Sequence, residues 1–334
     1  MTNCRVLLPL KCAKVYANYD KFSENYDILL TNVIVCGIIL NGGDYMVDKE
    51  TAKRALNRGM SIADLKQDQL ETYRYNALVK KSNMAIRKAK YSLTLQQQKL
   101  LNYLVSQVKD TDTKDTEKVF FIRDFFKFMG LKAEEQSYER VRKDLKALSD
   151  KSWWLDGAAD DGSDILVRFL GVVRTNKRSG RATIKWHEDM LPFLQHLHRE
   201  YTQYKLWFTM TMHSEYSARL YELLKSVAGK TVWNFSINEL KRLFMCENSY
   251  KLFADFKRRV IDTAVKEINE KSDLNVSYEL FKFGESGRAY TDIEFTITDK
   301  SNDELIRVNR AIKEELERDE IDGQLGVEDM QYPF

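Results

Sequence analysis

The order of predicted elements occurs twice along this chain of 334 residues, and that repetition constrains the fold more than any other feature of the sequence. In each half, an amphipathic helix precedes a short β-rich segment, a short helix, a longer helix and a β-hairpin. A repeated order of this kind predicts two similar domains related by duplication. The chain is also long enough for two ordinary domains.

The first copy begins with an amphipathic helix at Thr94–Val108, where Thr94 and Gln97 form a predicted capping box. A longer helix is predicted over Ser137–Ser149, since apolar residues recur there at helical spacing: Tyr138, Val141, Leu145 and Leu148. The other elements of this copy are a strand at Val119–Ile122, a short helix at Arg123–Met129, and a hairpin with strands at Ile165–Thr175 and Ala182–Trp186 around the tip Asn176–Arg181.

The second copy begins with a helix at Ser214–Val227, for which Ser214 is the predicted N-cap. Its longer helix is predicted over Tyr250–Lys271, so that Tyr138 and Tyr250 open equivalent helices. The apolar stripe of this helix comprises Phe253, Phe256, Val260, Ala264 and Ile268. The other elements are a strand at Val232–Phe235, a short helix at Ser236–Met245, and a hairpin of Leu274–Phe283 and Ala289–Thr298 around the turn Gly284–Arg288.

This order of elements is that of a winged helix-turn-helix, in which the long helix enters the major groove of DNA and the hairpin, or wing, lies on the flanking backbone. We therefore predict an α+β fold of two tandem winged-helix domains. The expected divisions are an N-terminal extension at 1–70, a first winged-helix domain at 71–205, a second at 206–298 and an acidic tail at 299–334.

The charge is unevenly distributed along the chain. Residues 299–334 contain eleven acidic residues and five Lys or Arg, a balance of −6, so the preceding residues carry +9 of the net charge of +3. A basic body is suited to a polyanionic partner such as DNA.

Basic side chains gather on the predicted DNA-contacting elements. In the second long helix they are Lys251, Lys257, Arg258 and Arg259; in the first they are Arg140, Arg142, Lys143 and Lys146; the wings contribute Lys177, Arg178 and Arg181 in the first domain and Arg288 in the second. Arg can hold guanine with two parallel hydrogen bonds. Because the first wing is rich in cations suited to phosphate, whereas the second has only Arg288 at its tip, we expect base reading chiefly from the second domain. The first domain and its wing are expected to contact phosphates. The alternative is a solvated helix face with ion pairs such as Asp255–Arg259.

The N-terminal region fits neither copy of the repeat. Its apolar run Ile28–Leu40 has thirteen residues, too few for a membrane span, and three of the four cysteines lie before it or within it without metal-ligand spacing. We interpret the run as a buried strand or as part of a leader that precedes a start at Met46, since Gly42-Gly43-Asp44 can be encoded by a purine-rich ribosome-binding sequence. The alternative is a true extension packed on the first domain. The cysteines suggest a reduced, cytoplasmic protein.

One pattern suggests catalysis. His196 and His198, followed by Tyr201, resemble the metal-binding histidines and nucleophilic tyrosine of rolling-circle nicking enzymes. However, Tyr201 follows His198 too closely to reach over a metal from a separate helix, and no third ligand is evident. We therefore expect no catalytic residues, no metal and no cofactor, and an interdomain packing role for this segment.

Five segments carry a resemblance to a known family: Asn76–Ser82, Leu95–Leu104, Tyr216–Leu224, Asp255–Ile261, and Glu267–Asn269 with Tyr278. Together these segments, which span about residues 75–298, resemble the replication initiator proteins of iteron-containing plasmids. The resemblance implies two duplicated winged-helix domains, with base-reading cations at Lys257, Arg258 and Arg259.

The resemblance also implies function and partners. Such proteins bind directly repeated origin sites in double-stranded DNA as monomers, melt an AT-rich segment, and help to recruit the host initiator and the replicative helicase. As homodimers joined mainly through the first domain, many repress their own gene at an inverted repeat. This implies a bacterial, cytoplasmic protein without a membrane partner. Two alternatives remain. One is a transcriptional repressor without replication activity, and the other is a nicking endonuclease that uses His196, His198 and Tyr201.

Overall fold

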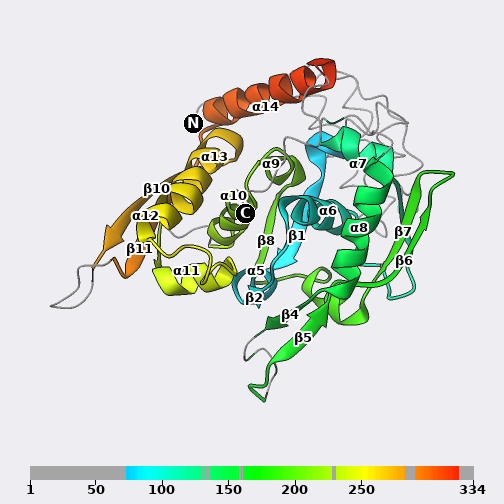
Figure 1. The fold of residues 1–334 in the computed structure, drawn as a ribbon, viewed down its shortest axis with the longest axis horizontal. Coiled ribbons are helices and arrows are strands. Elements are labelled where there is room, and N and C mark those ends of the chain that lie inside the picture. The colour runs from blue at the N-terminus through cyan, green and yellow to red at the C-terminus, as the bar shows by residue number, and fades with distance from the viewer. Residues whose placement is uncertain are drawn as a thin grey trace, which may run out of the picture. The chain divides into compact units, whose positions relative to one another are not determined.

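The computed structural model describes residues 73–129, 131, 136–155, 157, 159, 161–227, 231–282 and 290–322, all of which lie in the compact unit Ser61–Phe334. The predictions for Ile28–Leu40 and for a start at Met46 therefore lie outside the described residues. Figure 1 shows helices and short antiparallel sheets that follow one another in the predicted order.

The first winged-helix unit forms as the sequence patterns predicted. Helix α6 (Leu95–Val105) starts at the capping box of Thr94 and Gln97, whose side chains and backbone N–H groups bond reciprocally. Strand β3 (Lys118–Phe121) leads into helix α7 (Ile122–Phe128) and then into helix α8 (Ser137–Asp150). Of the predicted stripe on α8, Val141, Leu145 and Leu148 are fully buried. The periodic apolar positions therefore face the core.

The hairpin after α8 differs from the prediction, because the segment Ile165–Thr175 is not one strand. Strand β5 (Ile165–Arg168) pairs with β4 (Ser152–Leu155), while β6 (Leu170–Asn176) pairs with β7 (Arg181–Trp186). The break falls at Phe169, whose fully buried ring stacks on Trp153 at a centroid distance of 5.4 Å. Burial of this ring directs the chain from one sheet to the other.

The second unit repeats the first. Helix α10 (Glu215–Lys225) is capped by Ser214, as predicted, and β9 (Val232–Ser236) leads into α11 (Ile237–Leu243). The long helix begins at Phe253, three residues after Tyr250, and consists of α12 (Phe253–Phe256), the π-helical segment η4 (Lys257–Asp262) and α13 (Thr263–Lys271). The wing strands are β10 (Leu274–Phe281) and β11 (Asp292–Asp299).

The strand order of the two wing sheets confirms the duplication. The sheets have the orders β3-β7-β6 and β9-β11-β10, so in each the second wing strand lies between the first wing strand and the strand that precedes the short helix. Equivalent elements thus make equivalent pairings, and the fold is two tandem winged-helix domains.

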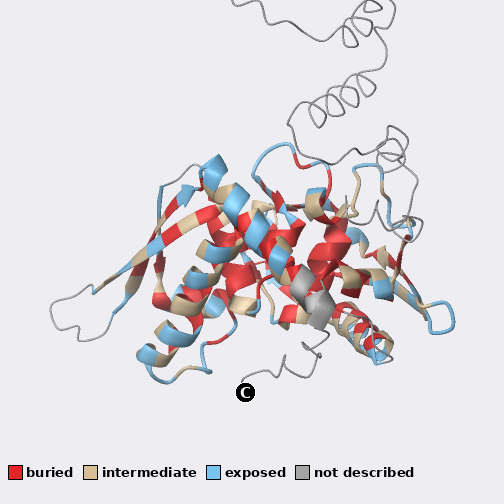
Figure 2. Cartoon of the chain, turned by 90° about the horizontal axis from the view of Figure 1, so that it is seen from above, coloured by how far each residue is buried: buried red, intermediate tan, exposed pale blue. Residues whose placement is uncertain are grey.

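Several elements were not predicted. Strand β1 (Leu78–Ser82) pairs with β8 (Tyr201–Lys205) in a two-stranded sheet, so that Ser82 lies opposite Tyr201. Short elements lie between these strands and the helices: α5 (Asn83–Arg87), β2 (Ala89–Lys90), the 3-10 helix η3 (Glu188–Phe193) and α9 (Leu206–Met210). Figure 2 shows buried residues on the inward faces of the elements and exposed residues along their outer sides.

A buried polar network connects α10 with β1, β8 and α5. Lys81 Nζ lies 2.7 Å from Glu222 Oε1, and the hydroxyl of Tyr204 donates to the same carboxylate. Arg219 donates to the carbonyl oxygens of Ile86 and Ala89 at 2.8 and 2.9 Å. Burial raises the pKa of Glu222, but the charges of Lys81 and Arg219 outweigh this effect and hold the pKa below its usual value. The segment Tyr216–Leu224 is therefore a structural junction.

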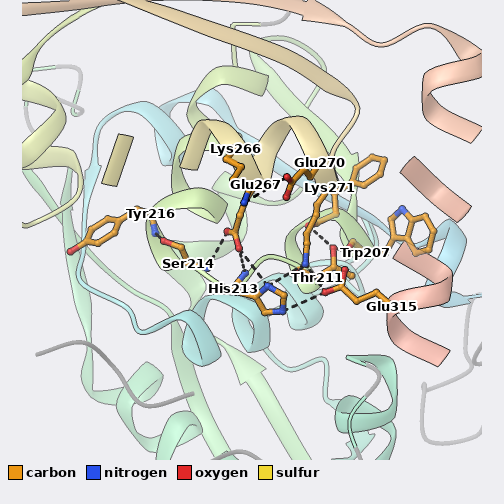
Figure 3. Close-up of polar contacts among 11 residues, drawn as sticks. Trp207, Thr211, His213, Ser214, Tyr216, Lys266, Glu267, Glu270, Lys271 and Glu315 are labelled. Atoms are coloured by element: carbon orange, nitrogen blue, oxygen red, sulfur yellow. Dashed lines mark hydrogen bonds and ion pairs between the residues drawn. The ribbon is translucent and has the colours of Figure 1, made fainter. Parts of the chain in front are cut away.

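Residues 302–322 form helix α14 (Asn302–Asp322), an element that acidic composition alone did not indicate. Its residues Val308, Ile312 and Leu316 are buried, and Lys271 Nζ at the end of α13 lies 2.6 Å from Glu315 Oε1. Figure 3 shows this ion pair beside Glu267, which accepts hydrogen bonds from the backbone N–H groups of His213 and Ser214. The end of the long helix is thus fixed to α14 and to the start of α10.

Candidate nucleic-acid interface

The long helix of the second unit presents cations opposite its core stripe. Phe256, Val260, Ala264 and Ile268 are buried, whereas Arg258 and Arg259 are exposed. The apolar stripe fixes the rotation of the helix, so these two cations face solvent near its start. This is the part of a recognition helix that meets base edges in helix-turn-helix complexes. Lys251, which was predicted to lie in this helix, is also exposed but precedes the N-cap Leu252.

One carboxylate holds both arginines. Asp255 Oδ1 lies 3.1 Å from Arg258 Nη2 and 4.0 Å from Arg259 Nε. The solvated ion pairing that the sequence offered as an alternative is therefore present, and it extends to Arg258. The side chains of Arg258 and Arg259 stay 70% and 55% exposed, so they remain accessible to an anionic ligand.

Lys257 differs from its two neighbours, because its ammonium group is tied to the helix and the wing. Its Nζ lies 2.9 Å from both carboxylate oxygens of Asp262 and 5.5 Å from the ring centre of Tyr278, whose hydroxyl donates to Asp262. These contacts, the hydrogen bond to Asp262 first, raise the pKa of Lys257. Lys257, Arg258 and Arg259 all belong to η4, and π-helical turns often mark functional segments.

The predicted cations of the first unit lie on α8. Arg142 and Lys143 are exposed, Arg140 is half-buried and donates to Gln136 Oε1 at 3.3 Å, and Lys146 pairs with Asp150. Arg142 Nη1 lies 3.3 Å from Glu139. Most of these cations are thus paired within their own helix, a pattern that moderates their attraction for phosphate.

The first wing is joined to α8 by the same glutamate. Lys177 Nζ lies 3.8 Å from Glu139 Oε1, so the wing tip and the helix place their cations side by side. Lys177, Arg178 and Arg181 are exposed, and Gly180 adopts φ 66°, which favours glycine at this turn. Arg288, the predicted cation of the second wing, lies outside the described residues.

Two cations that lie against aromatic rings, Arg123 and Lys282, were not among the predicted DNA-contacting residues. The guanidinium groups of Arg123 and Arg181 lie 4.9 and 5.2 Å from the ring centre of Phe121, beside the first wing. Beyond the end of β10 and before the start of β11, Lys282 Nζ lies 4.9 Å from the ring centre of Tyr290. The pairing of β3 with β7 places Arg181 opposite Phe121, a contact between residues distant in sequence.

The His–Leu–His segment does not form a catalytic arrangement. His196 and His198 are exposed, and Tyr201 lies on β8 with Lys80 Nζ 4.6 Å from its ring centre. The interdomain packing role expected of the segment is wrong for both histidines, because only Leu197 between them is buried. Within the described ranges, no group of three or more His, Cys, Asp or Glu side chains is placed to hold a metal. No helix among those residues is long and apolar enough to cross a membrane.

The two equivalent units, each with a long helix and a wing that expose cations, define a protein of the tandem winged-helix class. Residues 78–225 match the family described as "Initiator Replication protein, WH1", and residues 236–297 match "Initiator Rep protein, WH2". Together these ranges cover more than half of the chain. The chain belongs to the family of initiator replication proteins. The first range ends with α10, and the second begins at the last residue of β9.

Two relatives from Escherichia coli are similar in sequence. A protein described as "Replication initiation protein" is 25% identical over 197 residues, which cover 56% of this chain and 61% of that protein. A protein described as "Uncharacterized 27.6 kDa protein" is 28% identical over 145 residues, or 42% of this chain and 58% of that one. The alignments thus span about three fifths of each relative.

Among solved structures, the fold is similar to that of the Pi initiator protein in complex with iteron DNA. The TM-score is 0.56 at 16% sequence identity, and the match covers 68% of this chain and 99% of that one. At this identity the similarity concerns the fold alone.

Proposed function

We propose that this protein initiates plasmid replication by binding directly repeated sites in double-stranded origin DNA and promoting the opening of an adjacent AT-rich segment. The observation that carries the proposal is the exposure of Arg258 and Arg259 on the recognition helix of an initiator-family fold. The bound DNA of the Pi initiator protein, an iteron, supports the choice of a repeated site.

The two units have different tasks in this proposal. The second domain, at 206–298, reads bases through Arg258 and Arg259, and Lys251, Lys257 and Arg288 contribute further contacts to the DNA. The first domain, at 71–205, positions the protein through phosphate contacts from α8 and from Lys177, Arg178 and Arg181. The wing cations are suited to this task because all three are exposed at or beside the turn of the hairpin, where they can reach the DNA backbone.

The partners follow from the same proposal. The DNA-bound initiator recruits the host initiator and the replicative helicase in the bacterial cytoplasm. A homodimer that is joined mainly through the first domain, and is in equilibrium with the monomer, represses the protein's own gene at an inverted repeat. No metal or cofactor takes part.

Footprinting on the DNA that flanks the gene tests the proposal. We expect regularly spaced protection over direct repeats, with the binding to a repeat tighter than to random DNA of equal length. Uniform protection without a preferred sequence would contradict it. A replicon that lacks only this gene separates initiator from repressor: it should fail to replicate, and supplying the protein in trans should restore replication.

A nicking reaction is tested on the same origin. A variant with His196→Ala and Tyr201→Phe should keep DNA binding and replication, since both side chains lie exposed without a metal-binding arrangement in the described part of the chain. Metal-dependent cleavage by the parent protein that this variant loses would show that the protein is an enzyme.

A further inference from the structure

The residue before the recognition helix is an exposed leucine. Leu252 is the N-cap of α12, and its exposed fraction of 66% is the largest among the large apolar side chains that the structure describes. Exposed apolar side chains are common singly, so exposure alone does not assign a role to this residue. Its position supplies the further evidence.

An N-cap is a position where leucine is unfavourable. Ser, Thr, Asp and Asn are preferred there because their side chains accept hydrogen bonds from the free N–H groups of the first turn. In this protein Ser214 and Ser236 cap α10 and α11 in that way, whereas Leu252 makes no side-chain cap. The helix that carries the predicted base-reading residues therefore begins without a side-chain cap, as α8 in the first unit also does, and it presents an exposed apolar side chain beside its first turn.

The surroundings of Leu252 combine apolar and cationic groups. Phe253 is half-buried, with its ring 5.5 Å from that of Tyr290, and Lys282 lies over Tyr290. Lys251 precedes the leucine, and Arg258 and Arg259 follow within two turns. An apolar side chain with cations on either side complements a polyanion that also presents an apolar group.

We propose that Leu252 recognises thymine in the repeat by packing against its 5-methyl group in the major groove. This inference rests on the proposed function, and it adds a residue and a base to it. Residues at the start of a recognition helix contact base edges, and the methyl group is the apolar feature that a thymine presents there. Leu252 provides apolar recognition, while Arg258 and Arg259 provide hydrogen bonds.

The test uses a duplex with one protected repeat, in which each thymine is replaced in turn by uracil, so that only the methyl group is removed. The full-length wild-type protein should lose about fourfold in affinity at one thymine, the value for one buried methyl group. Leu252→Ser should bind the repeat more weakly and show equal affinity for thymine and uracil at that position. The Tm of this variant should be unchanged or higher, since serine can cap α12.

Ile306→Ser is the matched control, because Ile306 is a 57% exposed apolar residue on α14. It should keep the thymine preference in full. If the wild type prefers the repeat but is insensitive to loss of the methyl group, only the role of Leu252 is overturned. The same holds if Leu252→Ser still binds the thymine duplex more tightly than the uracil duplex. Equal affinity of the wild type for the repeat and for random DNA overturns the proposed function, and this inference with it.

Discussion

Asp255 Oδ1 lies 3.1 Å from Arg258 Nη2, so the predicted base-reading arginine is paired with a carboxylate three residues earlier on the same helix. The same oxygen lies 4.0 Å from Arg259 Nε. Exposed pairs of this spacing contribute only about 0.2–0.5 kcal/mol. DNA can therefore displace Asp255 at small cost, and the aspartate orients the two guanidinium groups in the free protein.

Replacing either arginine should weaken specific binding. Arg258→Ala and Arg259→Ala are each expected to cost about 1–3 kcal/mol on the repeat, the value for a lost bidentate contact to a base. The loss on random DNA should be smaller. Titrations on repeat and random duplexes at one salt concentration measure both quantities. Equal losses on the two duplexes would show that the arginines contact phosphate only.

Replacing Asp255 should raise the affinity for random DNA, whereas replacing either arginine lowers it. Asp255→Asn removes the negative charge that pairs with both arginines, so affinity for random DNA should rise by about three- to tenfold, with a steeper dependence on salt. Glu270→Gln is the control, because it makes the same charge change at the other end of the long helix, where Glu270 pairs with Lys266. An equal increase in both variants would attribute the effect to net charge.

The first wing should contribute equally to the affinity for any DNA sequence. Replacing Lys177, Arg178 and Arg181 together with Gln should weaken binding to repeat and random DNA by similar factors, since fewer counterions are released. The slope of log affinity against log salt should fall by up to about three. An unchanged slope would exclude the wing from the interface.

Much of the fold was predictable because its signals are local. Thr94 and Ser214 mark helix starts through contacts within three residues, and the apolar stripes of α8 and the long helix recur at helical spacing. The pairing of β1 with β8 was missed because its partners, such as Ser82 and Tyr201, are distant in sequence and no nearby turn sets their register. The break at Phe169 depends on ring packing in three dimensions.

The sequence indicated which cations of the candidate site lie on the long helix, but it indicated fewer of the residues with which they pair. Helix position identified Arg258 and Arg259, and the spacing of Asp255 from Arg259 indicated one ion pair. By contrast, the tie between Lys257 and Tyr278 joins the recognition helix to a strand of the wing. Such a contact depends on how the wing folds back, which the sequence does not specify locally.

A buried lysine predicts a pH dependence of stability. Lys99 is 4% exposed, and burial, with a contribution from the charge of Lys271, lowers the pKa of its ammonium group to about 8. The unfolded chain, with a pKa near the usual value of about 10.4, binds more protons between these pKa values. The free energy of unfolding should therefore gain a contribution as pH rises from about 8 to about 10.

Comparison with a variant isolates this contribution. Lys99→Met removes the charge and keeps the length, so it should be more stable than the wild type by about 1–3 kcal/mol at pH 7, and the difference should shrink as pH rises. Urea unfolding at several pH values measures this difference, with the exposed Lys143→Met as the control. A difference that is constant with pH would show that Lys99 keeps its usual pKa in the folded protein.

The last prediction concerns the attachment of α14 to the recognition helix. Lys271 is 11% exposed, and its Nζ bonds to Glu315 Oε1 at 2.6 Å and to the carbonyl oxygen of Thr211 at 3.1 Å. Glu315→Gln leaves this largely buried ammonium group without its carboxylate, which should lower the free energy of unfolding by about 1–3 kcal/mol. Amide exchange should become faster in α14 and in the last turn of α13, because Glu315 joins these two helices.

Asp303→Asn is the matched control for Glu315→Gln, since it removes an exposed carboxylate from the first turn of the same helix. It should change stability by less than about 1 kcal/mol, the usual effect of a charge near a helix end. Hydrogen exchange followed by mass spectrometry distinguishes the two variants by location. If Glu315→Gln leaves exchange in the last turn of α13 unchanged, the Lys271–Glu315 ion pair does not hold the two helices together.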